Sequence, residues 1–102
     1  MIIITGSVLT TAETRAELEA ECVKHSQRSR AEPGCIAHNV HEDCENNDLL
    51  VFIEKWADVT AVKTHFAVPE SGAFVAKLRS LASAPPTIEI YNSEEVPFTA
   101  LA

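Results

Sequence analysis

The chain of 102 residues has little basic charge and no long apolar run. Eight Lys and Arg stand against 15 Asp and Glu, and a formal net charge of -7 repels a phosphate backbone unless the basic side chains gather on one face. They are spread along the sequence, so we expect no nucleic-acid partner. No apolar stretch reaches the roughly 18 residues that cross a bilayer, and the N-terminus does not read as a signal peptide. We therefore expect no membrane association and a cytoplasmic location.

The chain is also poor in cysteine and glycine, with three of each. An odd number of cysteines with no C-x-x-C pair predicts neither a disulfide framework nor a zinc site. His38 and His41 are three residues apart in an expected strand and should face opposite sides of a sheet, which disfavours a shared metal. No phosphate-binding or dinucleotide-binding glycine motif is present. We expect no metal, flavin, nicotinamide or other cofactor.

What is present is typical of one folded domain over residues 1–102, with 46% hydrophobic and 23% charged residues. Residues 2–9 are β-branched and apolar and predict a strand. Thr10 with Glu13 forms a capping-box pattern for a helix that should run to about Arg30. Its expected apolar stripe comprises Ala16, Leu18, Cys22 and Val23.

The second half predicts a hairpin, two helices and a final strand. Residues 35–42 and 49–56 should pair across a polar loop at 43–48. Asp58 should cap a short helix over 59–66. Pro69 begins a second helix with an apolar face, which ends before Pro85-Pro86. A strand over 87–92 precedes an acidic tail, 93–102.

The predicted order is β-α-β-β-α-β, a ferredoxin-like α+β fold with a four-stranded antiparallel sheet and helices on one face. The strands carry Ile, Val and Leu on both faces. The face without helices, which includes Ile3, Val51 and Ile53, should therefore pack against a second copy. We expect a homodimer.

Three blocks of the sequence carry a resemblance to a known family. They are E-P-G-C at 32–35, E-x-W with Glu54 and Trp56, and A-x-x-x-H with Ala61 and His65. In this order and spacing the chain resembles the antibiotic biosynthesis monooxygenase (ABM) domain family. The resemblance implies a dimeric α+β barrel.

Members of that family differ in activity, so the resemblance implies several functions. The haem-degrading branch has Asn, Trp and His where this chain aligns Gly6, His65 and Val75, which disfavours haem degradation. The phenol-oxidising branch has an Asn where this chain has Phe52. The isomerase branch has a second His where this chain has Glu70.

His65 is the strongest catalytic candidate, because a neutral imidazole can accept a proton near neutral pH. The alternative is a hydrogen bond to a backbone carbonyl. Glu54 could orient His65 or act as a base, but a salt bridge to Lys or Arg at the sheet margin is the favoured reading. An aromatic ligand pocket could form between sheet and helices, although the same side chains could be ordinary core. These side chains are Trp56, Phe52, Phe66 and Phe74.

The leading hypothesis is a cofactor-independent monooxygenase that oxidises a small aromatic phenol or quinol with dioxygen, with His65 as base. One alternative is a non-catalytic dimeric protein that binds a small ligand or serves in stress. Another is an isomerase of a small carbonyl compound, with His65 and Glu54 as the proton-transferring pair.

Overall fold

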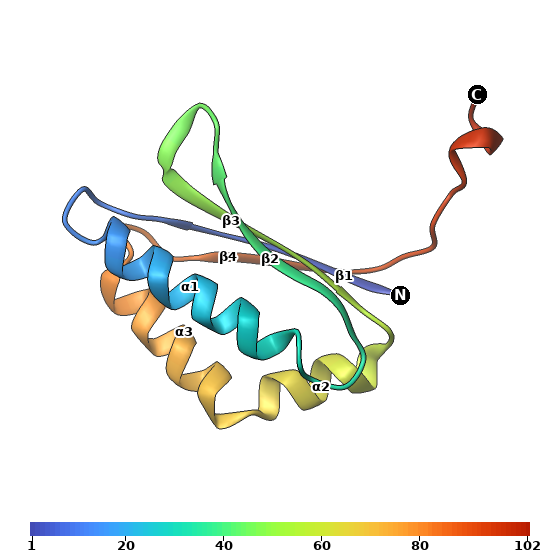
Figure 1. Cartoon of the computed structure of the whole chain (residues 1–102), viewed down its shortest axis with the longest axis horizontal. Helices are drawn as coiled ribbons and strands as arrows, with labels where there is room; N and C mark the ends of the chain where they lie inside the picture. The colour runs from blue at the N-terminus through green and yellow to red at the C-terminus, as the bar shows by residue number, and fades with distance from the viewer.

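The computed structural model describes all 102 residues and shows an α+β domain with one four-stranded antiparallel sheet and three helices (Figure 1). The predicted order of elements is confirmed. The elements are β1 (Ile2–Leu9), α1 (Arg15–Ser29), β2 (Cys35–Asp43), β3 (Asn46–Trp56), α2 (Val59–Ala67), α3 (Pro69–Leu81), β4 (Thr87–Asn92) and a short 3-10 turn, Phe98–Ala100.

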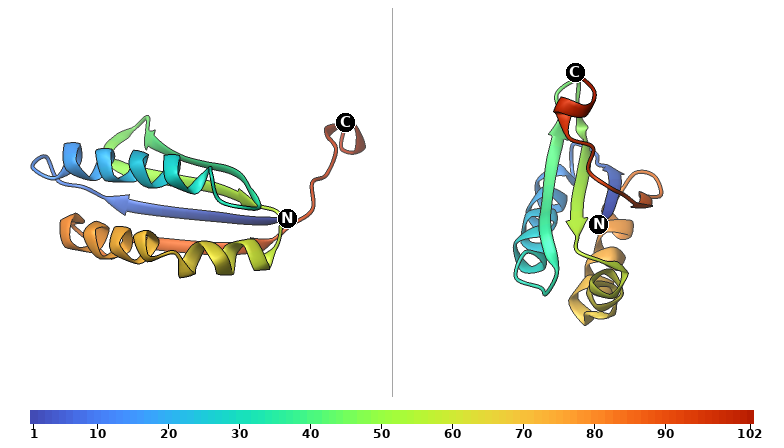
Figure 2. Two further views of the ribbon diagram at one scale, coloured as in Figure 1. Left: turned by 60° about the horizontal axis from the view of Figure 1, so that its bottom comes forward. Right: turned by 90° about the vertical axis from the view of Figure 1, so that its right-hand side faces the viewer.

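The strands lie in the order β2-β3-β1-β4, and every neighbouring pair is antiparallel. All three helices cover the same face of the sheet, as the two turned views in Figure 2 show. Alternate residues of a strand face opposite sides. Ile4, Phe52 and Trp56 therefore point toward the helices and are buried, whereas Ile53 on the other face is 43% exposed.

The core consists of two apolar clusters on the helix side of the sheet. One contains Val8, Leu18, Cys22, Leu50, Phe52, Phe74 and Leu78, and the other contains Ile2, Ile4, Trp56, Ala61 and Val62. Histidine rings connect the two clusters. His25 stacks on Phe74 with centroids 4.0 Å apart, and His65 lies 4.5 Å from Trp56.

Helix α1 begins later than the sequence predicted, at Arg15. The reciprocal capping contacts are made by Thr11 and Thr14, each of whose hydroxyl oxygens accepts from the other's backbone N–H at 3.0 to 3.2 Å. Thr10 instead donates its hydroxyl to the carbonyl of Asp48. The predicted box at Thr10 and Glu13 is thus one residue out of place.

The buried face of α1 is also more polar than predicted. Leu18 and Cys22 are buried as expected, but Val23 is 41% exposed and Ala16 is exposed. The rest of the buried face is polar and consists of His25, Ser26 and Ser29. The helix is therefore rotated so that its C-terminal half presents polar side chains to the sheet.

The hairpin between β2 and β3 is longer than predicted, because β3 begins at Asn46 and the turn is reduced to Cys44 and Glu45. Asp58 caps α2 as predicted, with its carboxylate accepting from the backbone N–H of Ala61 at 2.8 Å. Pro69 occupies the first turn of α3.

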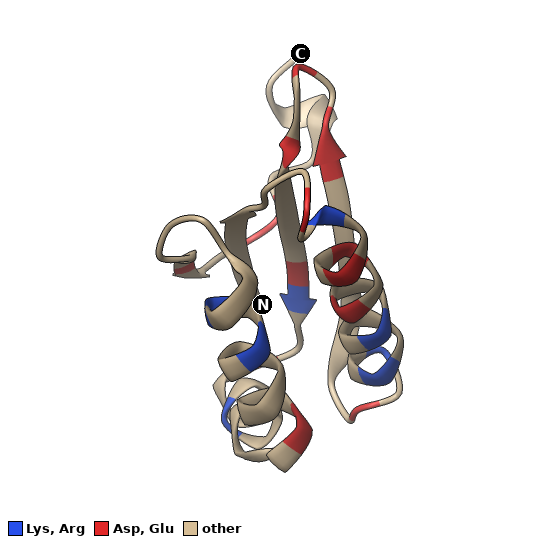
Figure 3. Cartoon of the chain, turned by 90° about the vertical axis from the view of Figure 1, so that its left-hand side faces the viewer, with Lys and Arg blue, Asp and Glu red and all other residues tan.

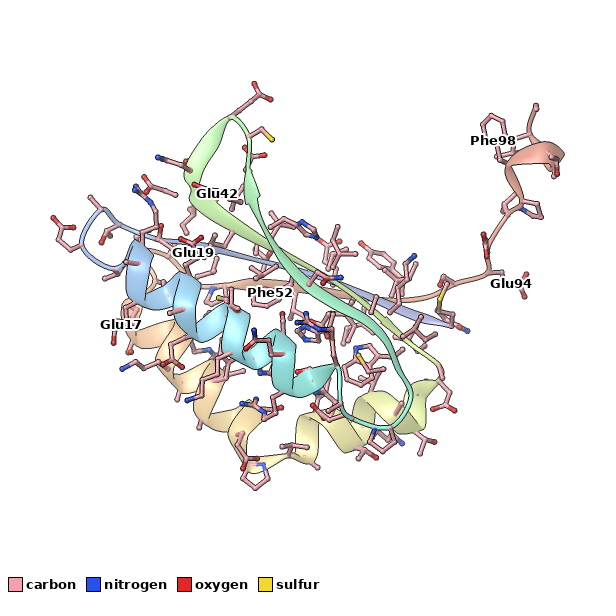
Figure 4. The ribbon with its side chains drawn as sticks, in the orientation of Figure 1. Glu17, Glu19, Glu42, Phe52, Glu94 and Phe98 are labelled. Carbon is pink, nitrogen blue, oxygen red and sulfur yellow. The ribbon has the colours of Figure 1, made fainter.

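The C-terminal tail extends away from the body of the domain (Figures 1 and 4). Phe98 on this tail is 83% exposed and Leu101 is 77% exposed. On α1 the acidic residues Glu17, Glu19 and Glu21 lie between Arg15 and the basic Lys24 and Arg28, and on α3 Glu70 precedes Lys77 and Arg79 (Figure 3). None of the helices has the length and apolar character needed to cross a membrane.

Candidate functional site

A cavity of about 300 Å³ lies between the sheet and helices α2 and α3. Most of its lining surface is apolar, although half of the lining residues are polar or charged: Ser7, His25, Glu54, His65, Ser71, Arg79 and Thr87. Figure 4 shows Phe52 between the sheet and the helices. Ser71, also in the lining, has a buried hydroxyl oxygen with no hydrogen-bond partner. The aromatic, imidazole and carboxylate side chains of the lining are those of His25, Phe52, Glu54, His65, Phe66 and Phe74.

His65 on α2 is held by a carboxylate that the sequence reasoning did not assign. Its Nδ1 lies 3.0 and 3.1 Å from the two carboxylate oxygens of Glu32. An ionised carboxylate only accepts hydrogen bonds, so Nδ1 carries the proton and the lone pair of the neutral ring is on Nε2. Glu32 thus orients the ring of His65, a role that the sequence offered to Glu54.

A glycine explains how Glu32 comes to lie against α2. Gly34 has φ of +80°, and a Cβ built on it would be only 2.5 Å from the Cβ of Ala61. Both the backbone conformation and the close approach require glycine here. The carbonyl of Gly34 accepts from the backbone N–H of Ala57 at 2.8 Å. E-P-G-C and A-x-x-x-H therefore interlock twice, through Gly34 with Ala61 and through Glu32 with His65.

Glu54 is 8% exposed and has no Lys or Arg partner. Its Oε1 accepts from Nε1 of Trp56 at 3.0 Å and lies 3.3 Å from Nε2 of His38. The geometry of the second contact is not that of a hydrogen bond, and Nε2 of His38 is left without a partner. Nδ1 of His38 lies 2.8 Å from the hydroxyl of Ser26. The predicted surface salt bridge of Glu54 is wrong, because this side chain lies in a buried polar chain.

His25 on α1 is the third buried histidine, 6% exposed. Arg28 donates from Nη2 to its Nδ1 at 2.7 Å. Arginine has no lone pair to offer, so Nδ1 must accept and the single proton of the neutral ring is on Nε2. Burial lowers the pKa of His25 from 6.5 to about 3, with smaller contributions from His38, His65 and Arg28.

His25, His38 and His65 each place a ring nitrogen within 4.8 Å of those of the other two. Three such nitrogens are a common zinc donor set. Here the bond from Arg28 leaves His25 with a protonated Nε2 and an occupied Nδ1, so this ring has no free lone pair for a metal. The sequence reasoning compared His38 only with His41, which is exposed, and missed this cluster.

The cysteines do not form a thiolate site. Burial raises the pKa of Cys22 to about 12. Burial, Glu32 and Glu54 also raise the pKa of Cys35. Cys44 is exposed in the hairpin turn. A thiol with a raised pKa is a weak nucleophile near neutral pH.

The structure brings most of the proposed site residues together. His65, Phe52, Glu54, Phe66 and Phe74 line the cavity. Trp56 was expected to line it too, but it is fully buried, lies outside the lining and packs against the ring of His65. Glu32 and His25 were not proposed from the sequence. Glu32 stood in the quoted E-P-G-C block, and that was its only signal.

A family model described as antibiotic biosynthesis monooxygenase matches residues 1–77. "Uncharacterized protein sll1783" of Synechocystis sp. is 31% identical over 92% of this chain, and the match spans 64% of that protein's length. "Putative monooxygenase YcnE" of Bacillus subtilis is 34% identical over 83% of this chain and 90% of its own length.

Solved structures share the fold. A "putative antibiotic biosynthesis monooxygenase" from Deinococcus radiodurans is 28% identical, covers 95% of this chain and 96% of its own, and superposes with a TM-score of 0.90. Rv0793 from Mycobacterium tuberculosis covers 93% of this chain and 96% of its own with a TM-score of 0.86. At 19% identity, that second likeness concerns the fold alone.

Proposed function

Since the chain belongs to the antibiotic biosynthesis monooxygenase family, we propose that it is a cofactor-independent monooxygenase that oxidises a small phenol or quinol with dioxygen. The observation that carries this proposal is the pairing of His65 with Glu32 at a cavity of about 300 Å³. A base with its own carboxylate, facing a mostly apolar cavity, is suited to ionising a phenolic hydroxyl away from water.

In the proposed reaction, Nε2 of His65 takes the hydroxyl proton, and Glu32 stabilises the imidazolium that forms. The phenolate then transfers an electron from its ring to dioxygen, and the two radicals combine into a ring-bound peroxide anion. This anion takes the proton back from the imidazolium of His65 and becomes a hydroperoxide, and His65 is neutral again. Loss of water from this hydroperoxide gives the quinone. One phenol and one dioxygen yield one quinone and one water, with the remaining oxygen atom retained in the quinone. The protein contributes deprotonation, orientation and exclusion of water.

The aromatic walls fit this substrate class. Phe52 and Phe74 lie edge to face with centroids 5.9 Å apart, and Phe66 borders the cavity beside His65. Flat rings pack favourably against such walls. Phe52 stands where the phenol-oxidising branch has an amide side chain. Orientation of the substrate oxygen must therefore come from other groups of the cavity.

Oxygen uptake measured with a panel of phenols and quinols tests the proposal. We expect uptake with at least one of them, and we expect His65→Ala to reduce it roughly 100-fold or more with the fold intact. A ligand that binds but supports no uptake would instead favour the binding-protein alternative. Conversion of a carbonyl compound without oxygen uptake would favour the isomerase.

We also propose that the protein is a homodimer through the sheet face opposite the helices. Ile53 and Tyr91 on this face are 43% and 48% exposed, and Ile3 and Val51 are only half-buried. A second copy packed on this face would cover them.

A further inference from the structure

His25 is a buried polar group of the cavity lining to which the proposed reaction gives no role. It projects from α1, stacks with Phe74 at an interplanar angle of 4°, and is fixed at Nδ1 by Arg28. A buried imidazole is costly unless its polar atoms are partnered. Nδ1 has its partner in Arg28, and Nε2–H has none among the hydrogen bonds of the protein.

The tautomers of His25 and His65 are complementary. Arg28 makes Nε2 of His25 a donor, whereas Glu32 makes Nε2 of His65 an acceptor. Both side chains line the same cavity, and their ring centroids are 5.3 Å apart. Each Nδ1 is already occupied, so the Nε2 atoms are the ones available to a ligand.

The spacing of the two rings suits a single oxygen atom. A ring nitrogen of His25 and one of His65 are no more than 4.8 Å apart. An oxygen that makes two hydrogen bonds of about 2.8 Å, at an angle near 120°, joins nitrogens about 4.8 Å apart, so this upper limit is compatible with one shared oxygen. A phenolic hydroxyl can therefore donate to His65 while it accepts from His25.

We propose that His25 and His65 together form a binding site for one ionisable hydroxyl oxygen of a phenol or enol. In this site Nε2–H of His25 donates a hydrogen bond to the oxygen while the hydroxyl proton moves to Nε2 of His65. The proposal rests on the proposed function. It adds His25 as a second catalytic residue and names the class of substrate as one that is bound through an anionic oxygen. Proton transfer leaves an anion and an imidazolium in contact, so the net charge of the site does not change.

Glu32 and Arg28 support this arrangement, while Glu54 and Arg79, which also line the cavity, add one acidic and one basic group beside it. Glu32 stabilises the imidazolium of His65, and Arg28 strengthens the donor character of His25. Glu54 and His38 belong to the neighbouring row of buried polar side chains, in which Glu54 contacts Trp56 and His38 contacts Ser26. The hydroxyl of Ser71, buried without a partner, is available to a second polar group of the ligand.

The test uses 4-nitrophenol as the probe, because its anion absorbs in the visible and reports ionisation directly. The full-length protein is titrated with the probe at several pH values, and the phenolate band of the bound probe is measured. We expect half-ionisation of the bound probe about one pH unit or more below that of the free probe, which is a tenfold preference for the anion.

His25→Phe keeps a flat ring against Phe74 but removes the donor, and it should bind the probe with the phenolate preference lost. Turnover of any phenol that supports oxygen uptake should fall roughly 100-fold, as when a donor to a developing oxyanion is removed. His41→Phe makes the same exchange outside the cavity, beside Val51 on the sheet face opposite the helices, and it should match the wild type in both measurements and in its mass by light scattering. Arg28→Met should lie between the two, because His25 is then free to change tautomer.

An unchanged phenolate preference in His25→Phe would overturn the proposal. So would a preference that a chelator abolishes and added Zn²⁺ or Co²⁺ restores, since this would show a metal held by the three histidines. A clear phenolate band without oxygen uptake from any phenol would leave this binding site standing while the monooxygenase proposal fails. Oxygen uptake that does not depend on His25 would leave the monooxygenase proposal standing while this binding site fails. Thermal unfolding of each variant identifies losses that come only from misfolding.

Discussion

Replacing Glu32 with Gln tests the pairing on which the proposed chemistry depends. The carboxylate touches Nδ1 of His65 with both oxygens, and its side chain is 13% exposed. Two unit charges about 4 Å apart at an effective dielectric constant of about 20 attract by about 4 kcal/mol. We take about 2–3 kcal/mol of this as lost in Glu32→Gln, because some water reaches the carboxylate. That loss corresponds to a fall in kcat of about 30- to 150-fold.

The assay is oxygen uptake with a phenol on which the wild type is active. Glu70→Gln on α3 is the matched control, because it removes the same charge from an exposed position that makes no contact with His65. It should leave kcat unchanged. A Gln amide can still accept from Nδ1–H, so Glu32→Ala should be slower than Glu32→Gln, and added acetate should restore part of its activity.

Two results would refute this reasoning. The first is equal kcat for Glu32→Gln and Glu70→Gln when His65→Ala has lost turnover, since the base would then act without its carboxylate. The second is a loss in Glu32→Gln that tracks a lower Tm, since the carboxylate would then hold the turn rather than the imidazolium.

Four further outcomes are expected. Gly34→Ala should lower the unfolding free energy by at least about 2 kcal/mol, measured by urea unfolding, because the new Cβ meets Ala61 and φ is positive. Val51→Glu should split or unfold the proposed homodimer, as measured by light scattering. The unfolding free energy should fall as the pH drops from 6.5 toward 3, because the unfolded chain protonates His25 while the folded ring, with its pKa of about 3, stays neutral, and His25→Phe should remove that part of the slope. Turnover should survive replacement of all three cysteines by Ser, at Cys22, Cys35 and Cys44.

The fold was predictable because its signals are local. Runs of β-branched and apolar residues predict the strands, and Asp58 and Pro69 predict where the two later helices begin. The errors occur where a residue distant in the sequence determines the local hydrogen bonds. Thr10 looks like an N-cap from its neighbours, but its hydroxyl is taken by the carbonyl of Asp48, so the capping box moves to Thr11 and Thr14.

The site was predictable only in its apolar part. Aromatic residues of the right parity on β3 and the buried stripe of α3 identify a cavity wall, and the family motif identifies His65. The polar contacts of the site join residues that are far apart in the sequence. Glu32 and His65 are 33 residues apart, and Ser26 and His38 are 12 residues apart. A hydrophobic stripe cannot reveal them. It selected Val23 for the core of α1 where the structure buries His25.

The burial of three imidazoles links the stability of this domain to its chemistry. Each buried ring is held at Nδ1 by one polar partner, Arg28, Ser26 or Glu32. A neutral imidazole with one fixed nitrogen has its other nitrogen committed as a donor or as an acceptor. For His25 and His65, the partner that stabilises the fold therefore also sets which Nε2 donates a proton and which accepts one. Substitution of Arg28 or Glu32, with the histidines left in place, should therefore alter reactivity more than it alters packing.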